Sequence, residues 1–525
     1  MKVLLVSNIH PAAVEMLKGS VDVDEAPDLS TEELKERIAD VDGVLVRSKP
    51  KLTEDILKHA KQLKVIGRAG IGVDNIAVDY ATKSGIIIVN APEASTTTVA
   101  EHAFGMILGL ARKIPQAVAN VKSGRWDKKK FMGTEVRGKT LGVVGLGRIG
   151  SRVAEMGRAF GMDIVAYDPY LSQETAQKRG IELLEIDDVL KKADFVTLHL
   201  PRTEKTAGLI GSHAFEIMKN TGYLVNCARG GIVDEAALKE ALSKGEIAGA
   251  ALDVFESEPP ADPSILESDN LIATPHLGAS TVEAQENASV TTARDILSVL
   301  GGEAPKNPVN MPVFAPDVME RLNPYMGLCE NMGRLAIQLT SGRVESVEVV
   351  YCGSLRELKE KDLLTKTVLK SLLSPILLNT INIVNSELIA RDRGIKVVQG
   401  ESEDAEDYRS MIILTVKSDE ASLELKGVVL GGMHQKIVGI DGYSLEIVPS
   451  GNILLVKNED RPGIIGSIAT TLGRHGINIG SMQAGRKKVG ETQIMALTMD
   501  QEISEEALTS LSLVDGVLSV KATKN

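Results

Sequence analysis

The sequence predicts an α/β protein with two parallel-sheet domains followed by two smaller α/β domains. Over residues 1–97 and 140–273, short apolar segments alternate with amphipathic segments, as in the βαβ units that build parallel sheets. Residues 145–150 read Gly-Leu-Gly-Arg-Ile-Gly, a motif typical of a Rossmann-type dinucleotide-binding unit. Residues 451–525 show the order βαββαβ of a ferredoxin-like domain. Together these patterns define the predicted fold class.

Length and composition agree with several globular domains. The chain has 525 residues, whereas single cores rarely grow beyond roughly 250–300 residues. Its hydrophobic content of 43% is ample for several cores, and the aromatic content of 3% means that aliphatic residues build most of them. The net charge of −12 argues against a nucleic-acid-binding protein, which needs a basic surface.

Targeting and metal-binding signals are not apparent in the sequence. The three cysteines show neither a metal-ligand spacing nor an even disulfide set. The first residues lack a signal-peptide core, and no apolar run reaches the roughly 18 residues of a membrane helix. We therefore expect a cytoplasmic protein without a metal site and without a membrane-spanning segment.

The first 97 residues predict a parallel sheet that carries arginines at its strand ends. Strands are expected near 2–7, 43–47, 64–66 and 86–89, with helices at 31–39, 53–60 and 74–84. Arg47 and Arg68 each follow a strand, and a glycine-rich turn that includes Gly70 comes next. Ligands of open α/β sheets bind outside the carboxyl ends of the strands, so these residues are candidates for binding an anionic substrate. The alternative is that the arginines only face solvent.

Two long helical patterns set the domain organisation. Residues 96–123 predict a helix capped by the threonines at 96–98, and residues 281–300 predict another. We expect these helices to connect a discontinuous, flavodoxin-like substrate domain (residues 1–97 and 281–305) to an inserted nucleotide domain (residues 98–280). Residues 301–312 are rich in Pro, Gly and Asn and predict a linker. An intervening α/β domain (residues 306–450) and the terminal domain (residues 451–525) then follow.

Each glycine of the 145–150 motif has a predicted role. Gly145 permits a tight turn, Gly147 lets the backbone approach a pyrophosphate, and Gly150 lets the helix lie close to the strand. The helix N-terminus offers N–H groups to the phosphates. Asp168 ends the second strand, at the spacing expected of the acid that binds a ribose 2′-hydroxyl. Because a carboxylate repels a 2′-phosphate, the sequence favours NAD over NADP.

Three consecutive strand ends of the nucleotide domain carry Arg229, Glu258 and His276. A histidine, with an ordinary pKa of about 6.5, is the usual base for a hydroxyl proton. A nearby carboxylate orients its ring, and an arginine binds a carboxylate through two parallel hydrogen bonds. These three residue types beside a nicotinamide site predict catalysis on a 2-hydroxy acid or its keto acid. The alternative for His276 is a structural histidine.

The intervening block has no catalytic cluster. Helical patterns are expected at 320–340 and 364–392, and strands near 344–351, 410–417 and 423–430. Lys426, His434 and Lys436 lie in a glycine-rich part of this block, either as plain surface residues or as an anion site.

The sequence resembles a known family at several motifs. The matching segments are residues 145–150, 226–231 (Asn-Cys-Ala-Arg-Gly-Gly), 253–260 and 275–280, which are similar to the D-isomer-specific 2-hydroxyacid dehydrogenases. Residues 131–133, the turn at 68–74 and the terminal βαββαβ unit resemble the long-form phosphoglycerate dehydrogenases, which end in an ACT domain. This resemblance implies NAD-dependent oxidation of 3-phospho-D-glycerate to 3-phosphohydroxypyruvate, the first step of L-serine biosynthesis, in a homo-oligomer, either a dimer or a tetramer.

The resemblance also assigns residues, motif by motif. It implies that Arg229, Glu258 and His276 are the catalytic residues, with Asp253 facing the nicotinamide. The expected cofactor-binding residues are Gly145, Gly147, Arg148, Ile149, Gly150, Asp168, Cys227, Ala228, Arg229, Asp253, His276 and Gly278. The expected substrate-binding residues are Arg47, Arg68, Gly70, Arg229 and His276. Trp126 and the lysines at 128–130 are expected near a neighbouring subunit's active site, unless the lysines only form a solvated face.

The ACT resemblance implies regulation by L-serine. Asn458, Asp460 and Asn478 match positions that hold the effector in feedback-inhibited relatives. The plainer alternative makes Asp460 a helix N-terminal residue and Asn478 a turn residue. Two other functions stay open from sequence: another D-2-hydroxyacid dehydrogenase, of the hydroxypyruvate or glyoxylate reductase type, and a non-catalytic relative that senses NAD.

Overall fold

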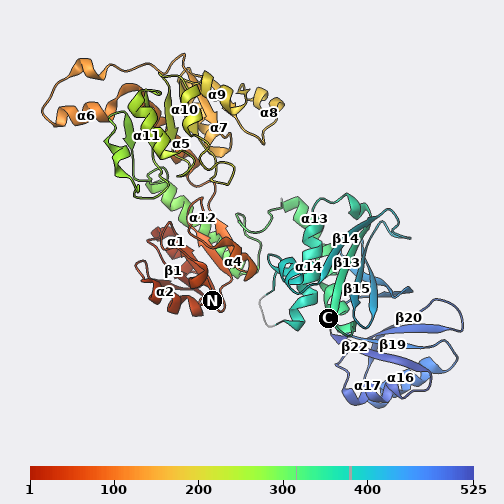
Figure 1. The fold of residues 1–525 in the computed structure, drawn as a ribbon. Helices are drawn as coiled ribbons and strands as arrows, with labels where there is room; N and C mark the ends of the chain where they lie inside the picture. The colour runs from red at the N-terminus through yellow and green to blue at the C-terminus, as the bar shows by residue number, and fades with distance from the viewer. Residues whose placement is uncertain (315, 378–380, 525) are drawn as a thin grey trace. The chain divides into compact units, whose positions relative to one another are not determined.

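The computed structural model describes residues 1–314, 316–377 and 381–524 (Figure 1). Its contacts divide the chain into two units. The first comprises Met1–Lys51, Ile66–Asn75 and Val89–Asn307, and it contains the whole nucleotide domain. The second comprises Leu52–Val65, Ile76–Ile88 and Pro308–Asn525.

The N-terminal sheet has five strands in the order β2-β1-β3-β4-β5. Its strands are β1 (Lys2–Leu5), β2 (Asp22–Glu25), β3 (Gly43–Val46), β4 (Val65–Arg68) and β5 (Ile87–Asn90). Strand β1 pairs in parallel with both β2 and β3. The helices between the strands are α1 (Pro11–Lys18), α2 (Thr31–Arg37), α3 (Glu54–Leu57) and α4 (Val78–Lys83). The predicted β-α alternation is confirmed, although the sequence interpretation missed α1 and the half-exposed strand β2.

The nucleotide domain has a seven-stranded parallel sheet in the order β12-β11-β10-β9-β6-β7-β8. Its strands are β6 (Thr140–Val144), β7 (Asp163–Tyr167), β8 (Glu182–Leu183), β9 (Phe195–Leu198), β10 (Tyr223–Asn226), β11 (Gly249–Leu252) and β12 (Leu271–Ala273). Two hydrophobic cores cover its two faces. One is built with α5 (Thr96–Arg112) and α7 (Arg148–Ala159), and the other with α9 (Ile186–Lys192), α10 (Ser212–Ile217) and α11 (Glu235–Lys244). The short α8 (Gln173–Lys178) precedes β8.

The two long helical patterns have different outcomes. Helix α12 (Val282–Leu300) forms as predicted, and the Thr281 side chain caps it by accepting the N–H of Ala284. The continuous helix predicted at 96–123 is wrong, because Lys113 adopts a left-handed conformation (φ 52°) and a new helix, α6 (Ile114–Lys122), begins after it. The threonines at 96–98 lie inside α5 rather than capping it.

The intervening domain packs three helices on one six-stranded sheet. The helices are α13 (Pro316–Leu339), α14 (Lys361–Leu373) and α15 (Ser386–Asp392). The sheet order is β14-β13-β15-β16-β17-β18, and only the β13–β14 pair is parallel. Its strands are β13 (Val344–Gly353), β14 (Lys396–Ser402), β15 (Ser410–Ser418), β16 (Ser422–Leu430), β17 (His434–Ile440) and β18 (Tyr443–Ile447).

The single helix predicted at 364–392 is replaced by two. Helix α14 ends at Leu373, and a short 3₁₀ turn that contains Pro375 follows it. Proline has no N–H to continue the helical hydrogen bonds, which explains the end of α14. Residues 378–380 of the predicted helix lie outside the described residues.

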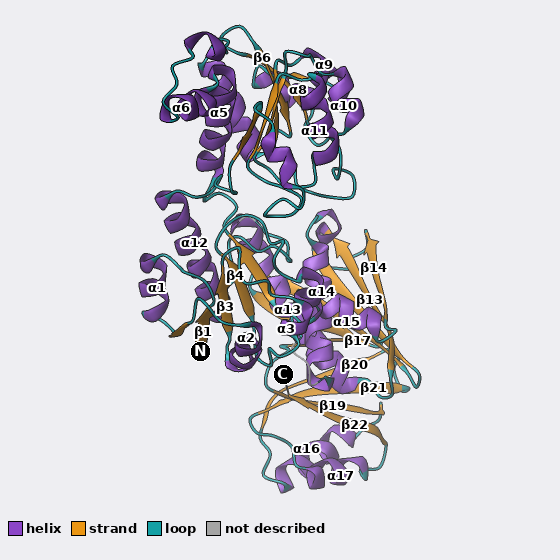
Figure 2. Ribbon diagram, turned by 60° about the vertical axis from the view of Figure 1, so that its left-hand side comes forward, coloured by secondary structure: helices purple, strands orange, loops and turns teal. Residues whose placement is uncertain are grey.

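The terminal domain confirms the predicted βαββαβ order. Its elements are β19 (Asn452–Glu459), α16 (Ile464–Arg474), β20 (Ile479–Arg486), β21 (Thr492–Met499), α17 (Glu505–Ser512) and β22 (Val517–Lys524). The antiparallel sheet has the order β20-β21-β19-β22, and both helices pack on one of its faces (Figure 2).

Among the helices of the described ranges, none is long and apolar enough to cross a membrane. Within the same ranges, no group of three or more His, Cys, Asp or Glu side chains is placed to hold a metal ion. All three cysteines, Cys227, Cys329 and Cys352, are free and buried.

Candidate nucleotide and substrate site

The glycine motif connects β6 to α7. Two of its positions, Gly145 and Gly150, leave no room for a larger side chain. Gly145 has a positive φ of 98°, which glycine adopts without strain. A Cβ on Gly150 would lie 1.9 Å from the Gly145 carbonyl oxygen, so only glycine lets the helix approach this turn. A Cβ on Gly147 would meet nothing within 4 Å, so the backbone there is open to a ligand. These features fit a dinucleotide pyrophosphate at the N-terminus of α7.

Asp168 stands directly after β7, the position of a ribose-binding acid. Its two carboxylate oxygens accept the N–H groups of Leu146 (2.8 Å) and Tyr170 (2.9 Å). The carboxylate is therefore fixed against the glycine turn. A negative charge held there disfavours the extra phosphate of NADP, in agreement with NAD as the cofactor.

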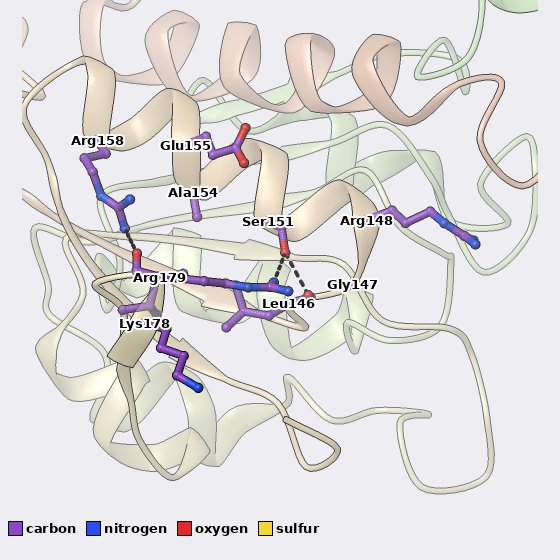
Figure 3. A pocket seen from close by; sticks show the side chains of 10 residues that line it. Leu146, Gly147, Arg148, Ser151, Ala154, Glu155, Arg158, Lys178 and Arg179 are labelled. Atoms are coloured by element: carbon purple, nitrogen blue, oxygen red, sulfur yellow. Dashed lines mark hydrogen bonds between the residues drawn. The ribbon is translucent and has the colours of Figure 1, made fainter. Parts of the chain in front are cut away.

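A cavity of about 800 Å³ runs along α7 beside the glycine turn (Figure 3). The predicted residues Gly147 and Arg148 line it, together with three cations that the sequence interpretation missed, Arg158, Lys178 and Arg179. Arg179 lies along the cavity and donates to the Ser151 hydroxyl at 3.2 Å. The only sequence signal for Arg158 and Arg179 is their place near the ends of α7 and α8. These cations give the flank of the nucleotide site a positive charge.

His276 and Glu258 form a hydrogen-bonded pair at the carboxyl edge of the sheet. Both carboxylate oxygens lie within reach of the His276 Nδ1 atom, at 3.0 and 2.9 Å. Nδ1 therefore carries the proton that it donates to the carboxylate, and Nε2 is left able to accept one. The side chains of His276 and Glu258 are 51% and 42% exposed, so a substrate can reach the imidazole. This is the arrangement of a general base with an orienting acid.

A second histidine near the nucleotide turn is unsuited to proton transfer. His199 is partly buried and contacts the Thr197 hydroxyl at 2.9 Å. Burial lowers the pKa of His199 to about 4, so its ring stays neutral at physiological pH. His276 is therefore the histidine placed for chemistry at this sheet edge.

Asp253 holds the loop that carries His276. It is only 1% exposed, and it accepts hydrogen bonds from the Thr274 hydroxyl (2.5 Å), the Leu277 N–H (2.7 Å) and the Gly278 N–H (2.8 Å). Burial disfavours its charge, but a hydrogen bond with the His102 side chain, followed by the bonds from these three donors, holds the pKa of Asp253 below its usual value. The carboxylate is thus a buried anchor of the loop.

Arg229 lies against a carboxylate from the N-terminal sheet. Its Nε atom is 3.4 Å from Asp74 Oδ2, and its Nη1 donates to the Ala228 carbonyl at 2.8 Å. The Asn226 side chain stabilises this turn by binding the Ala228 N–H and the Arg229 carbonyl. A Cβ on Gly72 would lie 2.3 Å from Arg229 Nη2, which explains the glycine there. Arg229 is one-third exposed and Asp74 is largely exposed, so a substrate carboxylate can reach the guanidinium in place of Asp74.

Arg68 adds a partly buried cation to this cluster. Its Nε atom is buried and has no hydrogen-bond partner. Burial, followed by repulsion from Arg229 and Arg47 that Asp74 partly offsets, lowers the pKa of Arg68 to about 10. Gly70 makes room for it, since a Cβ there would overlap the Arg68 guanidinium. The charges of Arg229 and Arg47 thus act on Arg68, and Asp74 offsets them only in part, a setting that favours an anionic ligand.

Comparison with known proteins places this geometry in a family. The chain is 46% identical over 521 residues to a D-3-phosphoglycerate dehydrogenase of Methanocaldococcus jannaschii, covering 99% of both chains. A D-3-phosphoglycerate dehydrogenase of Bacillus subtilis is 40% identical, covering 91% of both. The chain belongs to the D-3-phosphoglycerate dehydrogenase family. This confirms the predicted family.

Models of three domains match successive parts of this D-3-phosphoglycerate dehydrogenase family member. Residues 104–278 match the NAD-binding domain of D-isomer specific 2-hydroxyacid dehydrogenases, residues 321–441 the D-3-phosphoglycerate dehydrogenase intervening domain, and residues 452–512 the ACT domain. The chain is thus an NAD-dependent oxidoreductase, as predicted.

Two solved structures are similar to about three-fifths of the chain. D-lactate dehydrogenase from Aquifex aeolicus, complexed with NAD and lactic acid, is 30% identical with a TM-score of 0.54, covering 60% of this chain and 100% of that one. The TT0316 protein from Thermus thermophilus is 32% identical with a TM-score of 0.55, covering 59% and 100%.

The predicted effector residues of this D-3-phosphoglycerate dehydrogenase family member lie in the ACT domain. Asp460 accepts the Gly490 N–H at 3.0 Å and lies 3.6 Å from Arg486. Asn478 is exposed and donates to Asp500 at 2.5 Å. Asn458 is fully buried, and its Oδ1 atom has no hydrogen-bond partner. An unpaired buried amide oxygen beside Asp460 is unusual, since buried polar atoms are normally satisfied.

Proposed function

We propose that the protein oxidises 3-phospho-D-glycerate to 3-phosphohydroxypyruvate with NAD, as the first step of L-serine biosynthesis. The observation that carries this proposal is the arginine cluster of Arg47, Arg68 and Arg229, in which the buried Nε atom of Arg68 has no hydrogen-bond partner. A substrate with a phosphate at one end and a carboxylate at the other supplies the two anionic groups that such a cluster accommodates. The names of the relatives that match the full chain support the same substrate.

In this proposal the arginines bind the substrate, and the His276–Glu258 pair moves the proton. Arg229 binds the substrate carboxylate through its planar fork, while Arg47 and Arg68 attract the phosphate. His276 accepts the hydroxyl proton at Nε2, and Glu258 orients the ring through Nδ1. Bound NAD, held along residues 145–150 and at Asp168, supplies the hydride acceptor. We propose the same cofactor contacts at Ile149, Cys227, Ala228 and Gly278.

Substrate choice tests the proposal directly. We expect NADH formation from 3-phospho-D-glycerate with a kcat/KM about 10²–10³-fold above that for D-glycerate, because the latter leaves a partly buried guanidinium without its anion. NADH absorbance under steady-state conditions measures both. Equal rates of NADH formation from D-glycerate or D-lactate, or of NADH consumption with glyoxylate, would favour another D-2-hydroxyacid dehydrogenase. Absence of turnover with every acid would favour a non-catalytic NAD-sensing relative.

The ACT domain supports a second proposal, feedback control by L-serine. A zwitterionic amino acid needs a carboxylate for its ammonium group and amide donors for its carboxylate. Asp460 and Asn458 lie at one end of the terminal sheet and Asn478 at the other, so we propose that the effector binds between the ACT domains of two copies, one supplying Asp460 and Asn458 and the other Asn478. On binding, the effector would replace the hydrogen bonds of Asp460 with Gly490 and of Asn478 with Asp500.

L-Serine is therefore expected to lower kcat at saturating NAD and 3-phospho-D-glycerate. Asp460→Ala and Asn478→Ala should each raise the half-inhibitory serine concentration at least about 10-fold, the loss of one charge-assisted contact, and leave the uninhibited rate unchanged. Asp515→Ala removes another ACT carboxylate, which binds Arg461 at the surface, and serves as the control. If millimolar L-serine left the wild-type rate unchanged, the ACT domain would have a role in assembly only.

We further propose a cytoplasmic homo-oligomer with the four domains bounded at residues 97, 280, 305 and 450. Trp126 is 82% exposed, beside the exposed lysines at 128–130, which suits a surface covered by a second copy. Three free cysteines suit a reducing compartment.

A further inference from the structure

A third histidine lies behind the catalytic pair. His102 projects from α5, and its Nε2 atom lies 3.2 Å from Asp253 Oδ1 and 3.3 Å from the Thr274 hydroxyl. It belongs neither to the loop after β12 nor to the segment after β11. Its side chain is mostly buried, so the contact is shielded from water.

The hydrogen bonds around Asp253 define what His102 contributes. The Thr274 hydroxyl donates to Asp253 Oδ1, and the N–H groups of Leu277 and Gly278 donate to the same carboxylate. Because the Thr274 hydroxyl proton is donated to Asp253, both oxygens near His102 Nε2 can only accept a hydrogen bond. His102 must therefore carry its proton on Nε2 and donate it. His102 is the one donor in this set that comes from a helix outside the catalytic loop.

The loop needs such an anchor because its backbone is strained. His276 has a positive φ of 56°, a conformation that non-glycine residues rarely adopt. Its N–H donates to the Asp253 carbonyl at 2.9 Å, which fixes His276 directly. The Asp253 carboxylate also fixes the two residues that follow His276, by accepting the N–H groups of Leu277 and Gly278. A strained conformation persists only where its surroundings enforce it. Any shift of Asp253 therefore moves the His276 ring relative to Glu258.

We propose that His102 is a positioning residue for the dehydrogenase reaction: through its Nε2–H bond to Asp253 it keeps the His276 loop in its strained, productive conformation. The inference rests on the proposed function. It assigns His102 no contact with substrate or cofactor, so its removal should slow the chemical step and leave binding unchanged.

Two substitutions separate hydrogen bonding from packing. His102→Leu keeps the bulk without a donor, and it should lower kcat about 10–100-fold while leaving the KM for 3-phospho-D-glycerate and the NAD dissociation constant within about two-fold of wild type. His102→Gln places an amide N–H near the former Nε2, and it should recover kcat to within about three-fold. Thr274→Val, which removes another donor from the same carboxylate, should repeat the signature of His102→Leu.

The controls distinguish failure of this inference from failure of the proposed function. His213→Gln alters an exposed histidine that pairs with Asp187, and it should behave as wild type. Wild-type turnover is measured first, so its absence refutes the proposed function alone. Given an active wild type, three results overturn the positioning role. They are an unchanged kcat in His102→Leu, a kcat in His102→Gln that falls as far as in His102→Leu, or a His102→Leu enzyme with tenfold weaker NAD affinity and an intact kcat.

Discussion

Replacing His276 by alanine is expected to lower kcat by about 10³-fold, within the range that general acid–base catalysis contributes. In the proposed reaction the half-exposed imidazole is the base, and its contact with Glu258 fixes the tautomer that leaves Nε2 to take the proton. The NAD dissociation constant should change little, because the glycine turn and Asp168 are untouched. Steady-state NADH formation and NAD titration by fluorescence check the two parts.

Glu258→Gln tests the contribution of the carboxylate charge to the same step. It keeps a hydrogen-bond acceptor for Nδ1 but removes the charge that favours the protonated ring, so its kcat should fall less than that of His276→Ala. His213→Ala is the matched control, since it deletes an exposed histidine that also contacts a carboxylate. A His276→Ala enzyme with a near wild-type rate would exclude this residue as the base.

Replacing Arg229 by alanine is expected to reduce kcat/KM for 3-phospho-D-glycerate by about 10²–10³-fold, the cost of losing a charge-assisted, two-pronged contact. Arg229 follows strand β10, its charge acts on Arg68, and Asp74 lies 3.4 Å from its Nε atom. Arg229→Lys should recover only part of the loss, because an ammonium group cannot form two parallel hydrogen bonds.

Initial rates across substrate concentrations separate the KM and kcat contributions of Arg229. The control is Arg37→Ala, which removes another arginine paired with an aspartate, Asp24, from the same unit. If Arg229→Lys matched the wild-type enzyme, the guanidinium fork would have no special role, and simple charge attraction would be sufficient.

The features that sequence reasoning predicted depend on local spacing or on strand order. The roles of Gly145 and Gly150 follow from a turn between one strand and one helix, and the structure shows the close approaches that exclude side chains there. The His276–Glu258 contact follows from the rule that parallel strands end at one sheet edge. A threonine before α12 marks its start, and Thr281 caps it.

The features that were missed involve residues far apart in the chain or unusual backbone conformations. Asp74 and Arg229 are brought together by two different sheets, and nothing in either segment indicates the other. His102 reads as one polar residue in an apolar helix, and its role depends on Asp253 across the core. The left-handed turn at Lys113 is not apparent from helical periodicity, although Pro115 in the first turn of α6 is a recognised start signal.

The buried cysteines bear on how this enzyme responds to oxidative stress. Cys227 immediately precedes the Ala228–Arg229 turn, and burial, together with the nearby Asp253 charge, raises the pKa of its thiol. Burial likewise raises the pKa of Cys329 and of Cys352. Only thiolates react readily with peroxides and alkylating reagents. The three thiols are therefore expected to resist peroxides and alkylating reagents, even though Cys227 lies only two residues before Arg229.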